Sequence, residues 1–144
     1  MASASNELIG VATAFLRAYA PLVDLIGQNK IVYRADQNIA VPYVTVDDAF
    51  TTRGDMSCVD SIEVTLNIHV WTEGDCIADS CGPLQDARTI GALVIAALHR
   101  QALSLPSNTL VTLESTGERV FYDADGVSGH GVFAFNAVVE SALE

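Results

Sequence analysis

The segment from Ser61 to Trp71 alternates between apolar and polar residues without interruption. One side carries Ile62, Val64, Leu66, Ile68 and Val70, and the other carries Ser61, Glu63, Thr65, Asn67 and His69. A period of two residues is typical of a β-strand with one buried and one exposed face. At about 3.3 Å per residue the strand spans roughly 36 Å, about twice the usual length. The core of one small domain does not need such a strand, so we expect the sheet to reach beyond its own subunit.

The size and composition of the chain suit a single domain that associates with other chains. A length of 144 residues predicts one domain covering residues 1–144. Half of the residues are apolar and 17% are charged, which is below the roughly 25% charged residues of average soluble domains. Apolar side chains are therefore left over for the surface, and this favours an oligomer.

The charge balance argues against a nucleic-acid-binding surface. Seven Lys and Arg against 18 Asp and Glu give a formal net charge of −11, whereas binding to phosphates needs clustered cations.

No run of 18 apolar residues is present, so we expect no membrane span. The segment from Met1 to Glu7 lacks the basic and apolar regions of a signal peptide. We therefore expect a cytosolic product.

Helical periodicity predicts two main helices. The first begins near Ser5, has a serine cap and is interrupted by Pro21, after which one more turn ends at Gly27. The second begins at Pro83 and ends near Leu103. The apolar stripe of the first helix is formed by Leu8, Val11, Ala12, Phe15 and Tyr19.

Further extended segments complete the predicted sheet: Ile31–Arg34, Pro42–Phe50, Leu110–Phe121 and Gly131–Val139. Thr51–Ser57 and Thr72–Gly82 are predicted loops, and the sequence Asp123–Gly126 is typical of a hairpin turn. The order of elements predicts an α+β fold. It has a largely antiparallel or mixed sheet of about five strands, with two main helices packed on one face.

No group of residues predicts catalysis, a cofactor or a metal. The chain has no G-x-S-x-G, H-E-x-x-H or phosphate-binding loop, so we expect no enzyme. Cys76 and Cys81 lack the second pair of ligands that a zinc site needs. A disulfide between them is geometrically possible, but the cytosol opposes it, and free thiols are expected for them and for Cys58.

The three histidines and the single tryptophan are expected to be structural. His99 is predicted near a helix C-terminus, where a cation interacts well with the helix dipole. His130 lies between Gly129 and Gly131, whose small size lets the ring lie across a partner strand. Trp71 is more often an anchor in a core or an interface than a platform for a ligand.

Several short blocks follow one another in a characteristic order: Leu25-Ile26-Gly27, Ile31-Val32-Tyr33, Val41-Pro42-Tyr43-Val44, Ile68-His69-Val70-Trp71, Ala97-Leu98-His99, Asp125-Gly126 and His130-Gly131-Val132. In this order and spacing the chain resembles the phage tail-completion or tail terminator family, which also occurs in gene transfer agents. The resemblance extends from about Leu8 to Glu140. The cysteine-bearing loop from Glu73 to Gly82 is longer than the usual link of the family, so no role is carried over to it.

The resemblance implies a hexameric ring that caps the head-proximal end of the tail tube of a long-tailed phage. Such a ring ends polymerisation of the tube and joins the tail to the head connector. The implied partners are other copies of the chain, the tail tube protein and the head-tail connector protein, with no membrane. An acidic lumen would let DNA pass without specific binding. The implied location is the virion, after assembly in the host cytoplasm.

Exposed polar residues on the long strand and in the two predicted loops are the candidate interface, and at least one loop is expected to face the tube or the connector. These candidates are Arg53, Asp55, Glu63, Thr65, Asn67, His69, Trp71, Asp75 and Asp79. Two alternative functions remain open. One is a head-closure protein of the same phage neck, and the other is a small hydrolase or ligand-binding domain.

Overall fold

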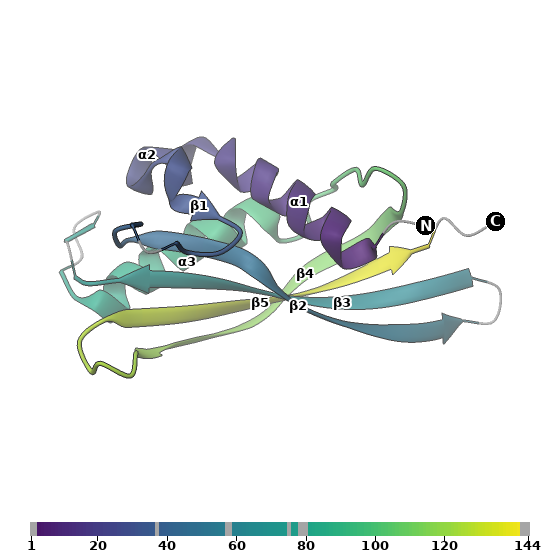
Figure 1. Cartoon of the computed structure of the whole chain (residues 1–144). Coiled ribbons are helices and arrows are strands. Elements are labelled where there is room, and N and C mark those ends of the chain that lie inside the picture. Colours follow the sequence, from purple (N-terminus) through teal and green to yellow (C-terminus); the bar gives the residue numbers. More distant parts are fainter. Residues whose placement is uncertain (1–2, 37, 57–58, 75, 78–80, 142–144) are drawn as a thin grey trace.

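A computed structural model of the chain describes residues 3–36, 38–56, 59–74, 76–77 and 81–141, with the backbone alone for residues 54–56 and 59–60. A five-stranded sheet carries all of the described α-helices on one face (Figure 1). The helices are α1 (Ala4–Arg17), α2 (Ala20–Ile26) and α3 (Pro83–Leu98), with a short 3₁₀ turn, η1 (Gln28–Lys30). The strands are β1 (Ile31–Val32), β2 (Tyr43–Met56), β3 (Val59–Thr72), β4 (Thr109–Tyr122) and β5 (Gly129–Glu140).

The sheet is mixed, with the strand order β1-β2-β3-β5-β4. The short strand β1 runs parallel to β2, and every other neighbouring pair is antiparallel. The last strand, β5, is inserted between β3 and β4, so each of the two long hairpins contributes to a common sheet (Figure 1). This architecture confirms the predicted α+β class and the predicted side of the helices.

The long alternating segment lies entirely within β3, which has 14 residues. Its even-numbered apolar residues from Val64 to Val70 are fully buried beneath the helices. The odd-numbered residues of β5 form the other half of the same buried layer, with Phe133 and Phe135 at its centre. The two central strands therefore provide most of the surface on which α1 and α3 pack.

The predicted loop at Thr51–Ser57 is wrong, because β2 continues to Met56. Its pairing with β3 runs without a break from Thr51 opposite Val64 to Met56 opposite Val59. The turn-like composition at Gly54 did not end the strand, because the partner strand supplies hydrogen bonds along its whole length. Ser57 lies outside the described residues.

The predicted end of the second helix is also too late. The helix α3 ends at Leu98, and Arg100 has a positive φ of 60°. The Arg100 N–H donates to the carbonyl oxygen of Leu113 at 2.7 Å. The helix therefore ends before Arg100, whose backbone is hydrogen-bonded to β4. The start of α1 is as predicted, with the hydroxyl of Ser3 accepting from the N–H of Asn6 at 3.2 Å.

The helix α3 approaches the sheet closely at Gly91. A Cβ atom at this position would overlap the ring of Phe133, whereas a Cβ atom at Gly10 in α1 would meet nothing within 4 Å. Both glycines lie within helices, where glycine is normally less favourable than alanine. The glycine at position 91 is therefore required by packing and not by helix geometry.

We predict opposite effects for alanine at these two positions. Gly91→Ala should lower the free energy of unfolding by about 1–3 kcal/mol because the new methyl group overpacks the core. Gly10→Ala should leave it unchanged or raise it by up to about 1 kcal/mol through helix propensity. Urea denaturation of both variants measures the difference, and a Gly91→Ala variant as stable as Gly10→Ala would contradict the close approach.

The carboxylate of Glu7 ties the first turn of α1 to the segment that precedes β4. It accepts hydrogen bonds from the Ser107 hydroxyl and from the N–H groups of Ser107 and Asn108, at 3.2 and 3.0 Å. The side-chain amide of Asn108 donates at 3.0 Å. The Ser107 hydroxyl is the main cause that lowers the pKa of Glu7 to about 2, and desolvation opposes it.

The Glu7 contact should make stability depend on pH. Because the pKa of Glu7 is lower in the folded state than its ordinary value of 4.5, its stabilising effect is present above that value and is lost as the pH falls toward 2. Glu7→Gln should therefore lower the melting temperature at pH 7, and this deficit should shrink between pH 4.5 and 2. Melting curves with Glu118→Gln as an exposed-carboxylate control provide the test, and a deficit that is independent of pH would contradict it.

Candidate functional site

Five of the nine predicted interface residues lie together on the face of the sheet that carries no helix. They are the residues of β3 that alternate with its buried positions: Glu63, Thr65, Asn67, His69 and Trp71. Since the helices lie on the other face (Figure 1), the side chains of these five residues are not covered by any described helix. We call the surface formed by the outward-pointing residues of β2 to β5 the helix-free face.

The other four candidates are not brought onto this face. Arg53 is exposed on β2 opposite Ile62, a register position on the helix-bearing side of the sheet. The backbone of Asp55 belongs to β2, but its side chain lies outside the description. Asp75 and Asp79 also lie outside the described residues. The structure thus groups the candidates of the long strand and separates them from those of the predicted loops.

A row of aromatic rings crosses one end of the helix-free face. The register aligns Tyr43 of β2, Trp71 of β3, His130 of β5 and Phe121 of β4. Trp71 and His130 stack with their centroids 3.7 Å apart, and the neighbouring pairs on either side are separated by 6.1 and 4.8 Å. At the far end, the guanidinium of Arg119 lies 5.0 Å from the Phe121 ring. All four long strands therefore contribute to one aromatic row.

Next to this row, two histidines and an aspartate form a chain of hydrogen bonds. His69 Nε2 lies 2.8 Å from the Asp48 carboxylate, and His69 Nδ1 lies 2.7 Å from His130 Nε2. An ionised carboxylate only accepts hydrogen bonds, so Nε2 of His69 carries a proton. Only one proton can occupy the contact between the two rings. Protonation of both rings would place two N–H groups against each other and break this contact.

Burial and charge both keep His130 neutral. Desolvation is the main cause that lowers the pKa of His130, and the positive charge of a protonated His69 adds to it, while Asp123 opposes both. Burial also raises the pKa of Tyr43, with a further contribution from Asp123. At neutral pH the centre of the row is therefore uncharged, and it has the composition of an interface anchor rather than of an ion-binding site.

His99 lies at the end of α3, as predicted, and its Nδ1 accepts the N–H of Ser115 at 2.9 Å. One expectation about the cysteines needs correction. Cys76 and Cys81 are not free thiols but are joined in a disulfide. This bond closes a short loop between β3 and α3, and Cys58 lies outside the described residues.

The described part of the chain contains no cluster of three or more His, Cys, Asp or Glu side chains with the geometry of a metal site. No single described helix is both long and apolar enough to cross a membrane, and only α1 and α2 taken together, with a 73° bend between them, pass that test of length and composition. The inner face of α1 is buried against the sheet, as in the core helix of a globular fold.

Reasoning from the sequence missed Asp48, Phe121 and Arg119 as parts of the helix-free face. Each lies on a different strand position from the long alternating segment, and only the register of β2, β5 and β4 brings them together. A bulge between Thr45 and Asp48 further shifts the pattern of β2. The one available signal was the pair of glycines around His130, which pointed to a ring lying across a neighbouring strand.

Comparison with known proteins identifies the same family that the ordered sequence blocks resemble. Residues 12–140 match the family described as Tail completion protein gp17. The chain belongs to this family. It is 26% identical over 129 residues to the Tail completion protein gp17 of Bacillus phage SPP1, covering 90% of this chain and 89% of that protein. Its fold is similar to a chain in the virion of a native gene transfer agent particle, with a TM-score of 0.83 at 22% identity, covering 98% and 100% of the two chains.

These similarities confirm the predicted resemblance and place this family member among structural proteins of virions, with a role in tail completion. They also argue against an enzymatic role, since the family is structural.

The His69–His130 contact predicts a loss of stability in mild acid. The pKa of His130 is lowered in the folded state, so the unfolded chain takes up a proton first as the pH falls below about 6.5. The stabilising effect is present above this pH and is lost below it. We expect the melting temperature to fall between pH 7 and 5, and His130→Phe to remove part of this slope. NMR titration of the ring is the direct measurement, and a His130 midpoint at or above 6.5 would refute the prediction.

Proposed function

We propose that this chain is a tail terminator. Six copies form a ring on the head-proximal end of the tail tube of a long-tailed phage or gene transfer agent. The ring ends polymerisation of the tube and offers the surface that joins the head connector. The observation that carries this proposal is the match to the tail completion family over residues 12–140.

The fold supports a protein that works in an assembly. The helices occupy one face of the sheet, so the other face and its aromatic row are available for partners (Figure 1). Trp71 and Tyr43 are residue types that often anchor interfaces, and the neutral His130 between Trp71 and Phe121 extends the apolar area. Identical subunits that meet through two different surfaces close into rings when the rotation allows it.

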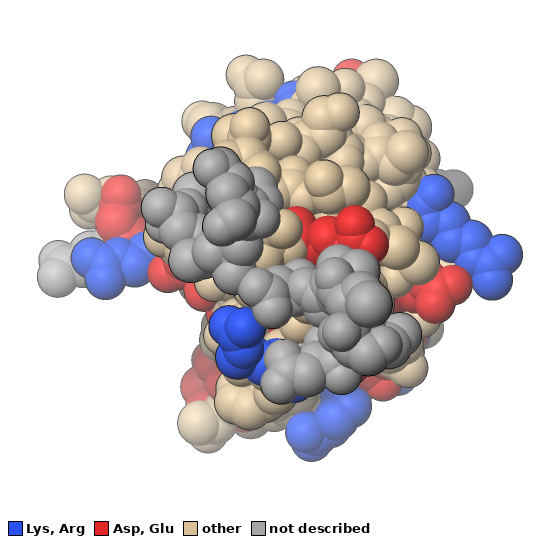
Figure 2. Space-filling view, turned by 90° about the vertical axis from the view of Figure 1, so that its right-hand side faces the viewer, with Lys and Arg blue, Asp and Glu red and all other residues tan. Residues whose placement is uncertain are grey.

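The charge of the chain suits a ring through which DNA passes without specific binding. The formal net charge is −11, and Figure 2 shows Lys and Arg side chains standing apart around the rim of one end of the molecule. Acidic walls repel phosphates, and dispersed cations give little affinity for DNA. A solved ring with a net basic lumen would contradict this part of the proposal.

The loop between β3 and α3 is the second contact that we propose. Long polar loops between ordered elements often bind other proteins, and Asp75 and Asp79 belong to this loop. We expect it to face the tube or the connector. Arg53 and Asp55, at the far end of β2, would then belong to a different contact from the loop.

The two alternatives predict different outcomes. A head-closure protein would bind on the portal side, and the family description, tail completion, favours the tube side. A small hydrolase would need a deep pocket with converging catalytic groups. The acid-base pairs described above lie instead on an open sheet face.

Imaging and particle assembly together test the proposal. Negative-stain images and native mass spectrometry should show six-fold rings of about 90 kDa, from a subunit of 15.3 kDa. Particles assembled without the protein should carry tubes of uncontrolled length that are not joined to heads. Particles assembled with the Gly10→Ala variant serve as the control and should have tails of normal length, because this substitution adds a methyl group where nothing lies within 4 Å. Tails of normal length joined to heads in the absence of the protein would rule the proposal out.

A further inference from the structure

A pocket of about 320 Å³ lies at the β1 side of the sheet, next to the Tyr43 end of the aromatic row. One wall is the segment that follows β1, and the other wall is formed by β2 and β3. The N–H of Asp47 donates to the carbonyl oxygen of Tyr33 at 3.1 Å and joins the two walls. We call this space the tyrosine pocket, and its lining residues are Tyr33, Arg34, Ala35, Tyr43, Thr45, Asp47, Asp48 and Trp71.

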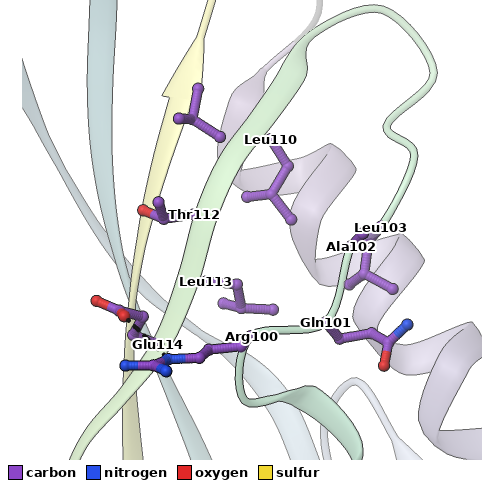
Figure 3. A pocket seen from close by; sticks show the side chains of 9 residues that line it. Arg100, Gln101, Ala102, Leu103, Leu110, Thr112, Leu113 and Glu114 are labelled. Atoms are coloured by element: carbon purple, nitrogen blue, oxygen red, sulfur yellow. Dashed lines mark ion pairs between the residues drawn. The ribbon is translucent and has the colours of Figure 1, made fainter.

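A second pocket of the same volume lies at the β4 edge of the sheet, and its composition is different. Figure 3 shows the side chains of Leu103, Leu110 and Leu113 around this space. Arg100 and Glu114 also line it and form an ion pair, with 3.4 Å between Nε and Oε2. The charged groups of this second pocket neutralise each other, so they do not select an occupant by charge.

The tyrosine pocket has aromatic walls, which suit a cation. The rings of Tyr43 and Trp71 are stacked, with 6.1 Å between their centroids and 26° between their planes. The faces of such rings attract guanidinium groups. Tyr33 is already used in this way, because the guanidinium of Arg17 lies 5.7 Å from the centroid of its ring. Tyr43 and Trp71 are therefore the rings that a cation from another protein would contact.

The same pocket contains a carboxylate that is available to a partner. Asp48 Oδ2 lies 2.8 Å from His69 Nε2, so this carboxylate is already engaged. The Asp47 carboxylate is exposed, and it has no hydrogen bond or ion pair with any residue that the structure describes. Arg34 lines the pocket too, but no ion pair joins it to Asp47 or Asp48. Two acidic groups and one basic group leave the pocket with a net negative charge.

We propose that the tyrosine pocket binds an arginine side chain of a partner protein. The guanidinium pairs with the carboxylate of Asp47 and stacks against the rings of Tyr43 and Trp71. Arginine suits both contacts, because its planar group forms two parallel hydrogen bonds with a carboxylate and stacks on aromatic faces. This inference rests on the proposed function, since it names the chemistry of one partner in the assembly.

The charges of the chain favour a different protein over a second copy as the partner. The formal net charge of −11 opposes any contact between copies that depends on charge. Four of the seven basic residues already contact groups of their own chain, namely Arg17, Lys30, Arg100 and Arg119. A partner with exposed arginine is instead attracted by this net charge. We therefore assign the pocket to a basic segment of another protein of the assembly.

Trp71 provides a local probe of the pocket, because it is the only tryptophan of the chain. Its indole N–H gives a single NMR signal, which can be followed during titration with a capped peptide that has one arginine between glycines. We expect a saturable shift, and binding at least about threefold weaker when glutamine replaces the arginine. Equal binding of the two peptides, or no shift, would overturn the inference. A shift that depends on protein concentration alone would assign the pocket to a second copy and would also overturn it.

Two substitutions with opposite effects test the charge of the pocket. Asp47→Asn removes the proposed ion pair and should weaken binding of the arginine peptide about two- to fivefold, the effect of one exposed ion pair. Arg34→Gln removes a competing cation and should strengthen binding by a similar factor. Glu114→Gln is the matched control, because it removes an exposed carboxylate that lines the second pocket, and it should leave binding unchanged. Effects of the same sign at positions 47 and 34, or no effect at either, would contradict the proposal.

Particle assembly separates this inference from the proposed function. We expect particles assembled with Asp47→Arg to lose tails that are joined to heads, and particles assembled with Glu114→Gln to keep them. Melting curves check that Asp47→Arg is folded, and Asp47→Asn takes its place if it is not. Normal, joined tails with a folded variant would refute the inference and leave the proposed function intact. If tail length does not depend on the protein at all, the proposed function fails, and the peptide titrations alone decide whether the pocket binds arginine.

Discussion

The fold depends on the pairing of β3 with a strand on each side. This strand pairs with β2 on one side and with β5 on the other, so its removal would separate the short β1–β2 pair from the β4–β5 hairpin. Two-stranded hairpins are marginal in water, whereas a sheet with a covered apolar face is stable. The uninterrupted alternation of β3 satisfies both requirements, because one face packs under α1 and α3 while the other remains open.

The same alternation forms the helix-free face, which we propose as the surface for partners. Because every second residue of β2 to β5 points away from the helices, side chains from distant parts of the chain meet on the helix-free face. Trp71 and His130 are 59 positions apart in the sequence but stack at 3.7 Å.

Periodicity in the sequence was sufficient to predict the central elements. The strand from Ser61 to Trp71, the start of α1 at its serine cap, and the start of α3 at Pro83 follow from local patterns and agree with the structure. The errors occur where pairing over long distances overrides local composition. Gly54 lies in a turn-like segment, yet it is a strand residue because β3 lies beside it. The ties of Glu7 to Ser107 and of Arg100 to Leu113 leave no local signal, and the aromatic row needs a register that no single segment contains.

The place of β5 in the sheet has a consequence for the order in which the molecule is made. Synthesis proceeds from the N-terminus, and the β2–β3 hairpin emerges well before residues 129–140. Until those residues arrive, β3 has one open edge, β4 has no partner in the sheet, and His130 is missing from the aromatic row. The surface that we propose for partners therefore forms only after residues 129–140 have been made. The topology withholds this surface from chains that stop before β5.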